Sequence, residues 1–135
     1  MDIDTWLKTV NETKDVSVLV SLFKTFQESI ELAHQVDYFD LKPILSAFNR
    51  ISRIVTDDNQ ISIIDALRAL VQHADHDIEL YIHDSLLWIV SCVLDYKVAV
   101  NKAAKRCLQT YLIKTRNIDA IMKIVVEHGL QSKHV

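Results

Sequence analysis

The chain has 135 residues, of which 50% are hydrophobic and 24% are charged, so its length and composition fit one globular domain. It holds one glycine, one proline and two cysteines, which excludes an all-β protein rich in tight turns and a small disulfide-linked scaffold. The net charge of −3 is unevenly distributed, because residues 1–95 sum to −9 and residues 96–135 sum to +6. The field of a charged partner would orient a molecule polarised in this way.

Hydrophobic residues recur at the period of an α-helix through almost the whole chain, and no segment alternates in the manner of a strand. The pattern predicts seven helices joined by short turns, so that neighbouring helices are mostly antiparallel. Their hydrophobic faces span residues 3–10, 16–33, 41–55, 63–71, 78–93, 100–112 and 118–126. The expected N-caps are Asp15, Asp40, the Asp57-Asp58-Asn59 cluster, Asp77 and Asn117.

Two of the predicted helices have distinctive hydrophobic faces. The fifth carries five consecutive hydrophobic residues from Leu86 to Val90, so we expect it to lie between neighbours and to be buried on most sides. The sixth has the most regular stripe, in which the small pair Ala103-Ala104 allows a neighbouring helix to approach closely. Cys107 belongs to the same stripe and is expected to be a packed, reduced thiol.

The spacing of the predicted helices indicates a repeat. The third, fifth and seventh begin near residues 40, 78 and 118, and a period of about 40 residues with two helices per unit is that of HEAT repeats. The expected fold is therefore all-α, with antiparallel helix pairs stacked as one short HEAT- or armadillo-like solenoid over residues 1–135. A closed bundle of the same helices is the competing architecture.

Two segments carry a family resemblance. Residues 86–98 pass from a hydrophobic helix through Asp95 to a valine, and residues 100–108 (VNKAAKRCL) continue with the alanine pair. Together they resemble a HEAT unit, although Asn101 stands where that family commonly has arginine. Residues 126–135 (VEHGLQSKHV) resemble an ending found in TOG domains, which are HEAT-built modules that bind tubulin, with His134 and Val135 at its Asn and Trp positions.

The TOG resemblance implies a non-enzymatic module that contacts tubulin through the turns inside each helix pair. Those turns would be Asp57–Gln60, Asp95–Lys97 and Ser132–Val135, although the aspartates of the first are unsuited to an acidic partner. A partner-binding surface in the basic C-terminal part and a cytoplasmic, cytoskeletal location follow from this resemblance. The predicted partner-binding residues are Tyr96, Lys97, Lys102, Lys133 and His134.

Other interpretations of the sequence stay open. A generic helical scaffold, or an oligomerisation domain that binds another copy of the chain, would need the same exposed helix surfaces. A TOG domain resembles six HEAT units and this chain holds about three and a half, so we expect either a fragment of a longer array or a small domain closed by its last helix. The basic segment could also bind nucleic acid, but the net negative charge favours a protein partner.

A cluster of histidines and aspartates allows an enzymatic alternative. The residues are His73, Asp75, His76, Asp77, His83 and Asp84. With His34 they are compatible with a metal-dependent hydrolase of the HD type, but histidine at a helix C-terminus and aspartate at a helix N-terminus explain them without a metal. We therefore predict no enzymatic activity, no cofactor and no metal. The hydrophobic runs are short, so no membrane-spanning helix is expected.

Overall fold

A computed structural model describes residues 2–33, 40–95, 97–115, 122–123 and 126, and the account below is confined to them. Within these ranges the protein is all-helical, as the sequence predicts, and has no strand. The elements are α1 (Ile3–Glu12), α2 (Val16–Ala33), α3 (Leu41–Ser52), α4 (Asn59–His73), the 3-10 helix η1 (His76–Leu80), α5 (His83–Val93) and α6 (Val98–Lys114).

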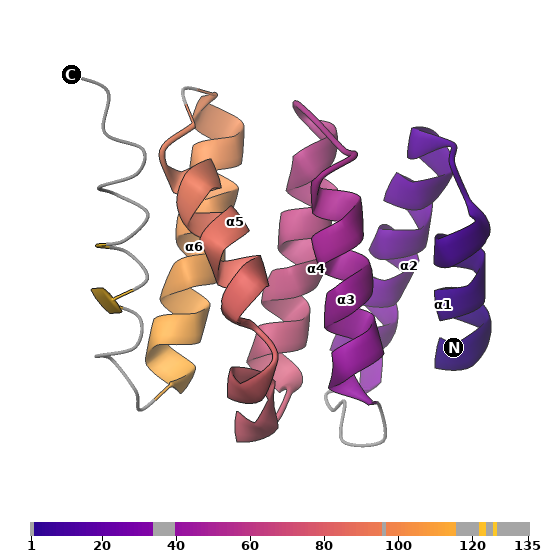
Figure 1. Cartoon of the computed structure of the whole chain (residues 1–135), viewed down its shortest axis with the longest axis horizontal. Helices are drawn as coiled ribbons and strands as arrows, with labels where there is room; N and C mark the ends of the chain where they lie inside the picture. Colours follow the sequence, from indigo (N-terminus) through magenta and orange to yellow (C-terminus); the bar gives the residue numbers. More distant parts are fainter. Residues whose placement is uncertain (1, 34–39, 96, 116–121, 124–125, 127–135) are drawn as a thin grey trace.

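The helices form two layers, and consecutive helices of the chain are antiparallel and lie in opposite layers (Figure 1). One layer contains α1, α3 and α5, and the other contains α2, α4 and α6. Within a layer, each helix contacts the helix that comes two places later in the chain, as α2 contacts α4 and α4 contacts α6. Helices that follow one another, as in the pairs α1–α2, α3–α4 and α5–α6, contact each other across the two layers. The largest contacts are α4 with α6 and α4 with α2, so α4 is the central helix.

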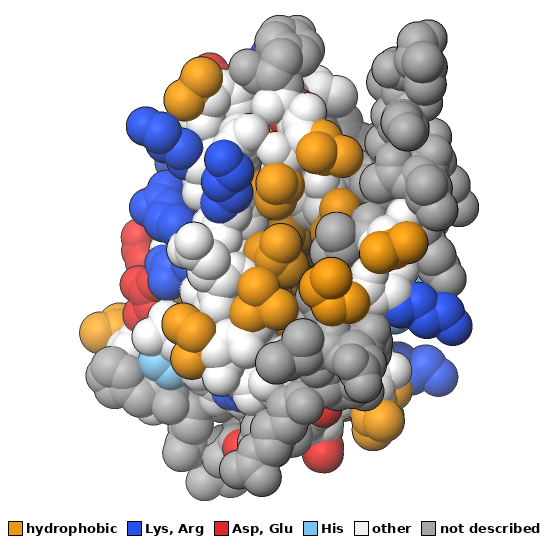
Figure 2. Space-filling view, turned by 90° about the vertical axis from the view of Figure 1, so that its left-hand side faces the viewer, with side chains coloured by type: hydrophobic (Ala, Val, Ile, Leu, Met, Phe, Trp, Pro, Cys, Tyr) orange, Lys and Arg blue, Asp and Glu red, His pale blue; other side chains and the backbone are white. Residues whose placement is uncertain are grey.

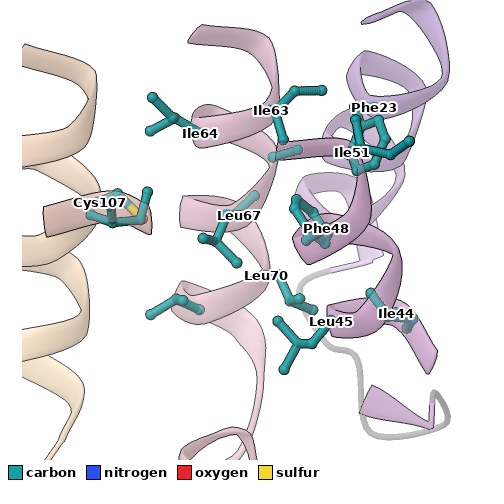
Figure 3. Packing of buried hydrophobic residues seen from close by; sticks show 14 of the residues in the cluster. Phe23, Ile44, Leu45, Phe48, Ile51, Ile63, Ile64, Leu67, Leu70 and Cys107 are labelled. Carbon is teal, nitrogen blue, oxygen red and sulfur yellow. The ribbon is translucent and has the colours of Figure 1, made fainter. Parts of the chain in front are cut away.

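The core lies between the two layers, with α4 at its centre. Figure 3 shows Leu70 of α4 directed toward Leu45 of α3, and Cys107 of α6 on the other side of α4. Small residues are completely buried on both of these helices, including Ala66 on α4 and Ala104 on α6. Small side chains shorten the distance at which two helices can pack, which is consistent with the large α4–α6 contact.

An aromatic cluster joins the first three helices. The ring of Trp6 of α1 packs edge-on against Phe23 and at a tilt against Phe26 of α2, with ring centroids 5.1 and 4.7 Å apart, and the ring centroid of Phe48 of α3 lies 4.9 Å from that of Phe23. The indole Nε1 of Trp6 donates a hydrogen bond of 2.8 Å to the carbonyl of Leu22, so the polar group of this buried side chain is satisfied.

Aspartates begin two helices as the sequence predicts. Asp15 accepts a hydrogen bond of 2.9 Å from the amide of Ser17, and Asp40 accepts one of 3.2 Å from the amide of Lys42. The hydrogen bonds from Ser17 also lower the pKa of the Asp15 carboxyl. Asp58 occupies the N-cap of α4 but makes no side-chain capping bond, so that part of the capping prediction is wrong.

The start of the fifth predicted helix is wrong. Residues 76–80 form η1 and α5 begins at His83, so Asp77 lies inside the 3-10 helix and does not cap an α-helix. Ile78 of η1 and Ile82, just before α5, are both buried. Their separation of four residues is the spacing expected in one continuous helix, although the α-helix begins only after them. As expected, α5 lies between two neighbours, α3 and α6, and its five-residue run is buried at Leu86, Ile89 and Val90 and half-buried at Leu87 and Trp88. The most central helix, however, is α4.

The seventh predicted helix lies mostly outside the described residues. Met122, Lys123 and Val126 are helical, and the side chains of Met122 and Val126 are about half exposed. The predicted count of about seven helices therefore compares with six α-helices and one 3-10 helix in the part of the chain that is described.

Candidate functional site

The turns inside the three helix pairs lie along the same edge of the molecule, at the top of Figure 1. Their described residues are 13–15, 53–58, 94–95 and 97, and we call these the turn edge. The 3-10 helix η1 lies at the opposite edge (Figure 1). The turns expected from the sequence at Asp57–Gln60 and Asp95–Lys97 overlap the second and third of these segments, and the turn expected at Ser132–Val135 lies outside the described residues.

An ion pair connects two neighbouring turns of this edge. The Nζ atom of Lys97, in the turn before α6, contacts Oδ1 of Asp57, in the turn before α4. Asp57 has a φ of 57°, in the left-handed region that aspartate tolerates better than most residues. The Lys97 side chain is 28% exposed, so this predicted partner-binding cation already has an anionic neighbour within the chain.

Two polar side chains fix the turn between α5 and α6. Asp95 accepts a hydrogen bond of 2.8 Å from the amide of Lys97, one residue before α6 begins. The amide nitrogen Nδ2 of Asn101 donates a bond of 2.7 Å to the carbonyl of Val93. Asn101, which departs from the arginine of the HEAT pattern, therefore satisfies a carbonyl at the end of α5.

Hydrophobic side chains are exposed on or beside the turn edge. Ile54, Leu94 and Val98 are 48%, 59% and 65% exposed. The charged residues there are the cations Lys14, Arg53 and Lys97 and the anions Asp15, Asp57, Asp58 and Asp95. This edge thus combines apolar contact area with balanced charge, and it lacks the basic character expected from the sequence for binding an acidic partner.

The predicted partner-binding residues do not form one described cluster. Lys97 lies on the turn edge, whereas Lys102 is exposed farther along α6. Tyr96, Lys133 and His134 fall outside the described residues. Sequence reasoning missed the pairing of Asp57 with Lys97, although their separation of 40 residues equals the predicted repeat length.

The chemistry available within the described residues is limited. No group of three His, Cys, Asp or Glu side chains there could hold a metal ion. His73 ends α4, while His83 and Asp84 are exposed in the first turn of α5. Burial raises the pKa of Cys107 to about 12, the opposite of the shift that activates a thiol.

A groove of about 280 Å³ separates α3 from α5. Its lining is Asn49, Ser52, Arg53, Asp84, Leu87, Trp88 and Ser91. The hydroxyl of Ser85 donates a hydrogen bond of 2.6 Å to Oδ1 of the lining residue Asn49, which connects the two helices. The groove therefore offers mixed polar and apolar contacts next to the turn edge, where it shares Arg53.

Two further findings concern membranes and relatives. None of the helices in the described ranges is long and apolar enough to cross a bilayer. Comparison with known proteins finds no matching family model, no matching curated protein and no matching solved structure.

Proposed function

We propose that this chain is a non-enzymatic protein-interaction module whose helix pairs stack as a short HEAT-like solenoid. The two-layer packing supports this architecture, since each helix pair makes its main contacts with the adjacent pair. The spacing supports it as well: α1, α3 and α5 begin at residues 3, 41 and 83, close to the period of a HEAT unit.

The turn edge is the proposed recognition surface, and the exposure of Ile54, Leu94 and Val98 is the observation that carries this proposal. Exposed aliphatic side chains cost free energy in water and recover it when a partner covers them. The hydrogen bonds of Asp95 and Asn101 hold the α5–α6 turn in place before binding. A fixed turn loses little conformational entropy on association.

Tubulin is the partner that the TOG resemblance names, and a cytoskeletal location follows if that partner is correct. Because Lys97 pairs with Asp57, the apolar side chains of the turn edge would supply more of the binding than its cations. Electrostatic attraction to an acidic partner would instead come from Lys102 and its neighbours on α6.

Co-sedimentation of the full chain with microtubules, together with gel filtration with free tubulin, tests this proposal. The informative variant is Ile54→Ser with Leu94→Ser, which removes apolar area from the turn edge. Its matched control is Leu32→Ser with Leu80→Ser, which changes two leucines that are 82% and 74% exposed and lie away from the turn edge. We expect the turn-edge variant to bind at least about tenfold more weakly and the control to bind normally.

Two results would contradict the proposal in different ways. Absence of tubulin binding by the wild-type chain at low salt would reject tubulin as the partner. Equal binding by both double variants would reject the turn edge as the surface. Far-ultraviolet circular dichroism should be the same for all three proteins, because the four substituted side chains are exposed. The gel filtration also reports self-association, which the oligomerisation alternative requires.

A further inference from the structure

The exposed side of α6 carries basic side chains that form no ion pair with the other described residues. The helix contains four lysine and arginine residues and no acidic residue. Lys102, Lys105 and Arg106 are exposed, and none of them forms a side-chain hydrogen bond or ion pair with another described residue. Their positive charge is therefore available to a partner, in contrast to that of Lys97.

Two of these cations align with an exposed hydrophobic residue. Lys102, Arg106 and Ile113 recur at spacings of four and seven residues, which places them along one side of the helix. Ile113 is 88% exposed. Lys102 and Ile113 are eleven positions apart in the sequence, which corresponds to about 17 Å along the helix.

A groove lies beside the Ile113 end of this stripe. It lies on the surface where α4 and α6 meet, has a volume of about 400 Å³, and is lined by Arg68, Gln72, Thr110, Ile113 and Lys114. On its α4 side, Nη1 of Arg68 donates a hydrogen bond of 3.3 Å to Oε1 of Gln72. The groove thus combines an exposed aliphatic side chain with two basic residues, of which Arg68 also pairs with Glu31 at 3.6 Å.

Figure 2 shows the end of the molecule on which α6 lies. Lys and Arg side chains gather toward one edge of this view, beside a band of hydrophobic side chains. Basic and apolar surface are therefore adjacent at this end of the stack.

We propose that this side of α6 binds an acidic peptide segment that carries a hydrophobic residue at one end. Carboxylates of the segment would pair with Lys102 and Arg106, while its hydrophobic side chain would lie against Ile113 in the α4–α6 groove. Charge complementarity selects the acidic partner. The inference rests on the proposed role as a protein-interaction module, but it uses a surface separate from the turn edge.

The apolar part of the stripe favours a peptide over a nucleic acid. A nucleic-acid surface needs cations along the phosphate backbone and, for single strands, aromatic side chains on which bases stack. Here an aliphatic side chain follows two cations, and the whole chain has a net charge of −3. An acidic segment ending in leucine matches this order of contacts.

The test is fluorescence anisotropy of a labelled peptide titrated with the full chain. A peptide of about twelve residues, rich in glutamate and ending in two leucines, matches the length of the stripe if it binds as a helix. The variants Lys102→Glu with Arg106→Glu, and Ile113→Ser alone, should each weaken binding at least about tenfold. The matched control Lys8→Glu with Lys24→Glu makes the same charge change on α1 and α2 and should leave binding within about twofold.

Several outcomes would overturn this inference. If the Lys102→Glu/Arg106→Glu variant and the Lys8→Glu/Lys24→Glu control weaken peptide binding equally, the peptide is attracted by the overall charge of the protein and not by a defined site. Equal binding of a peptide with glutamine in place of glutamate would remove the role of the cations. Tighter binding of an oligothymidylate of equal charge would make the surface a nucleic-acid site, and saturable self-association abolished by Lys102→Glu would make the partner a second copy.

The turn-edge variant separates this inference from the tubulin proposal. Ile54→Ser with Leu94→Ser should retain full affinity for the acidic peptide, since neither side chain lies on the α6 stripe or lines the α4–α6 groove. Loss of tubulin binding with retained peptide binding would show two separate surfaces. Loss of peptide binding in this variant would contradict the assignment to α6.

Discussion

Phe48 shows how single residues fix the packing of this fold. Its side chain is completely buried and makes edge contacts with Phe23 and Phe26. Replacing a buried phenylalanine by alanine removes hydrophobic transfer free energy and leaves a cavity. We expect Phe48→Ala to lower the free energy of unfolding by about 3–5 kcal/mol, measured by urea denaturation. Leu32→Ala, at an exposed position, should change it by less than about 0.5 kcal/mol, and equal effects would contradict the assigned core.

The two cysteines provide a second prediction at this scale. Burial raises the pKa of Cys92 to about 11 and that of Cys107 to about 12, so at pH 8 only about one Cys107 side chain in 10⁴ is a thiolate. Both thiols should resist Ellman's reagent in the native protein and react at once in guanidinium. The unfolded state ionises first, so stability should fall as the pH rises above the ordinary thiol pKa of 9.0. Fast labelling of native Cys107 would contradict its burial.

Among the helices, α6 depends most clearly on small side chains. Ala104 is completely buried where α6 packs against its neighbours, whereas Ala99 of the same helix is exposed. Ala104→Leu should overpack the interface and lower the free energy of unfolding by about 1–3 kcal/mol. Ala99→Leu makes the same chemical change on the solvent side and should be nearly neutral. Similar denaturation midpoints for the two variants would show that the helix is rotated relative to this account.

The helix boundaries show which part of the fold the sequence predicts well. The start at Ile3 follows from hydrophobic periodicity, and the starts at Val16 and Leu41 follow from periodicity combined with the capping aspartates Asp15 and Asp40; the structure confirms all three. The break between Ile78 and Ile82 could not be predicted this way, because both residues are buried and keep the helical interval. Hydrophobic periodicity reports which side chains face the core, and it does not report whether the backbone between them is one continuous helix.

Across the whole molecule, the ion pair of Asp57 and Lys97 connects the second and third helix pairs. The Asp57 side chain is 71% exposed, so a double-mutant cycle with alanine at each position should give a coupling of less than about 1 kcal/mol. The coupling should shrink further at high salt because ions screen partly exposed charges. A coupling that is large and independent of salt would contradict this description of the pair.

Asp57 and Lys97 show why the candidate site was harder to predict from the sequence than the fold. Charge counts along the sequence made Lys97 a cation for a partner, but they carry no information about which acidic residue lies beside it. Only the stacking of one helix pair on the next brings Asp57 to it from 40 residues away. Lys102 differs in that its exposure follows directly from its place opposite the hydrophobic stripe of its own helix.

The central place of α4 has a consequence for how the protein opens locally. Because α4 packs against α2, α3 and α6, its amide hydrogens can exchange with solvent only when several helices separate at once. Amides of α1, which packs at one end of the stack against α2 and α3 alone among its main contacts, need a smaller opening. Deuterium uptake should therefore be slowest in residues 63–71 and faster in residues 3–12, so that protection against exchange declines from the middle of the stack toward its N-terminal end.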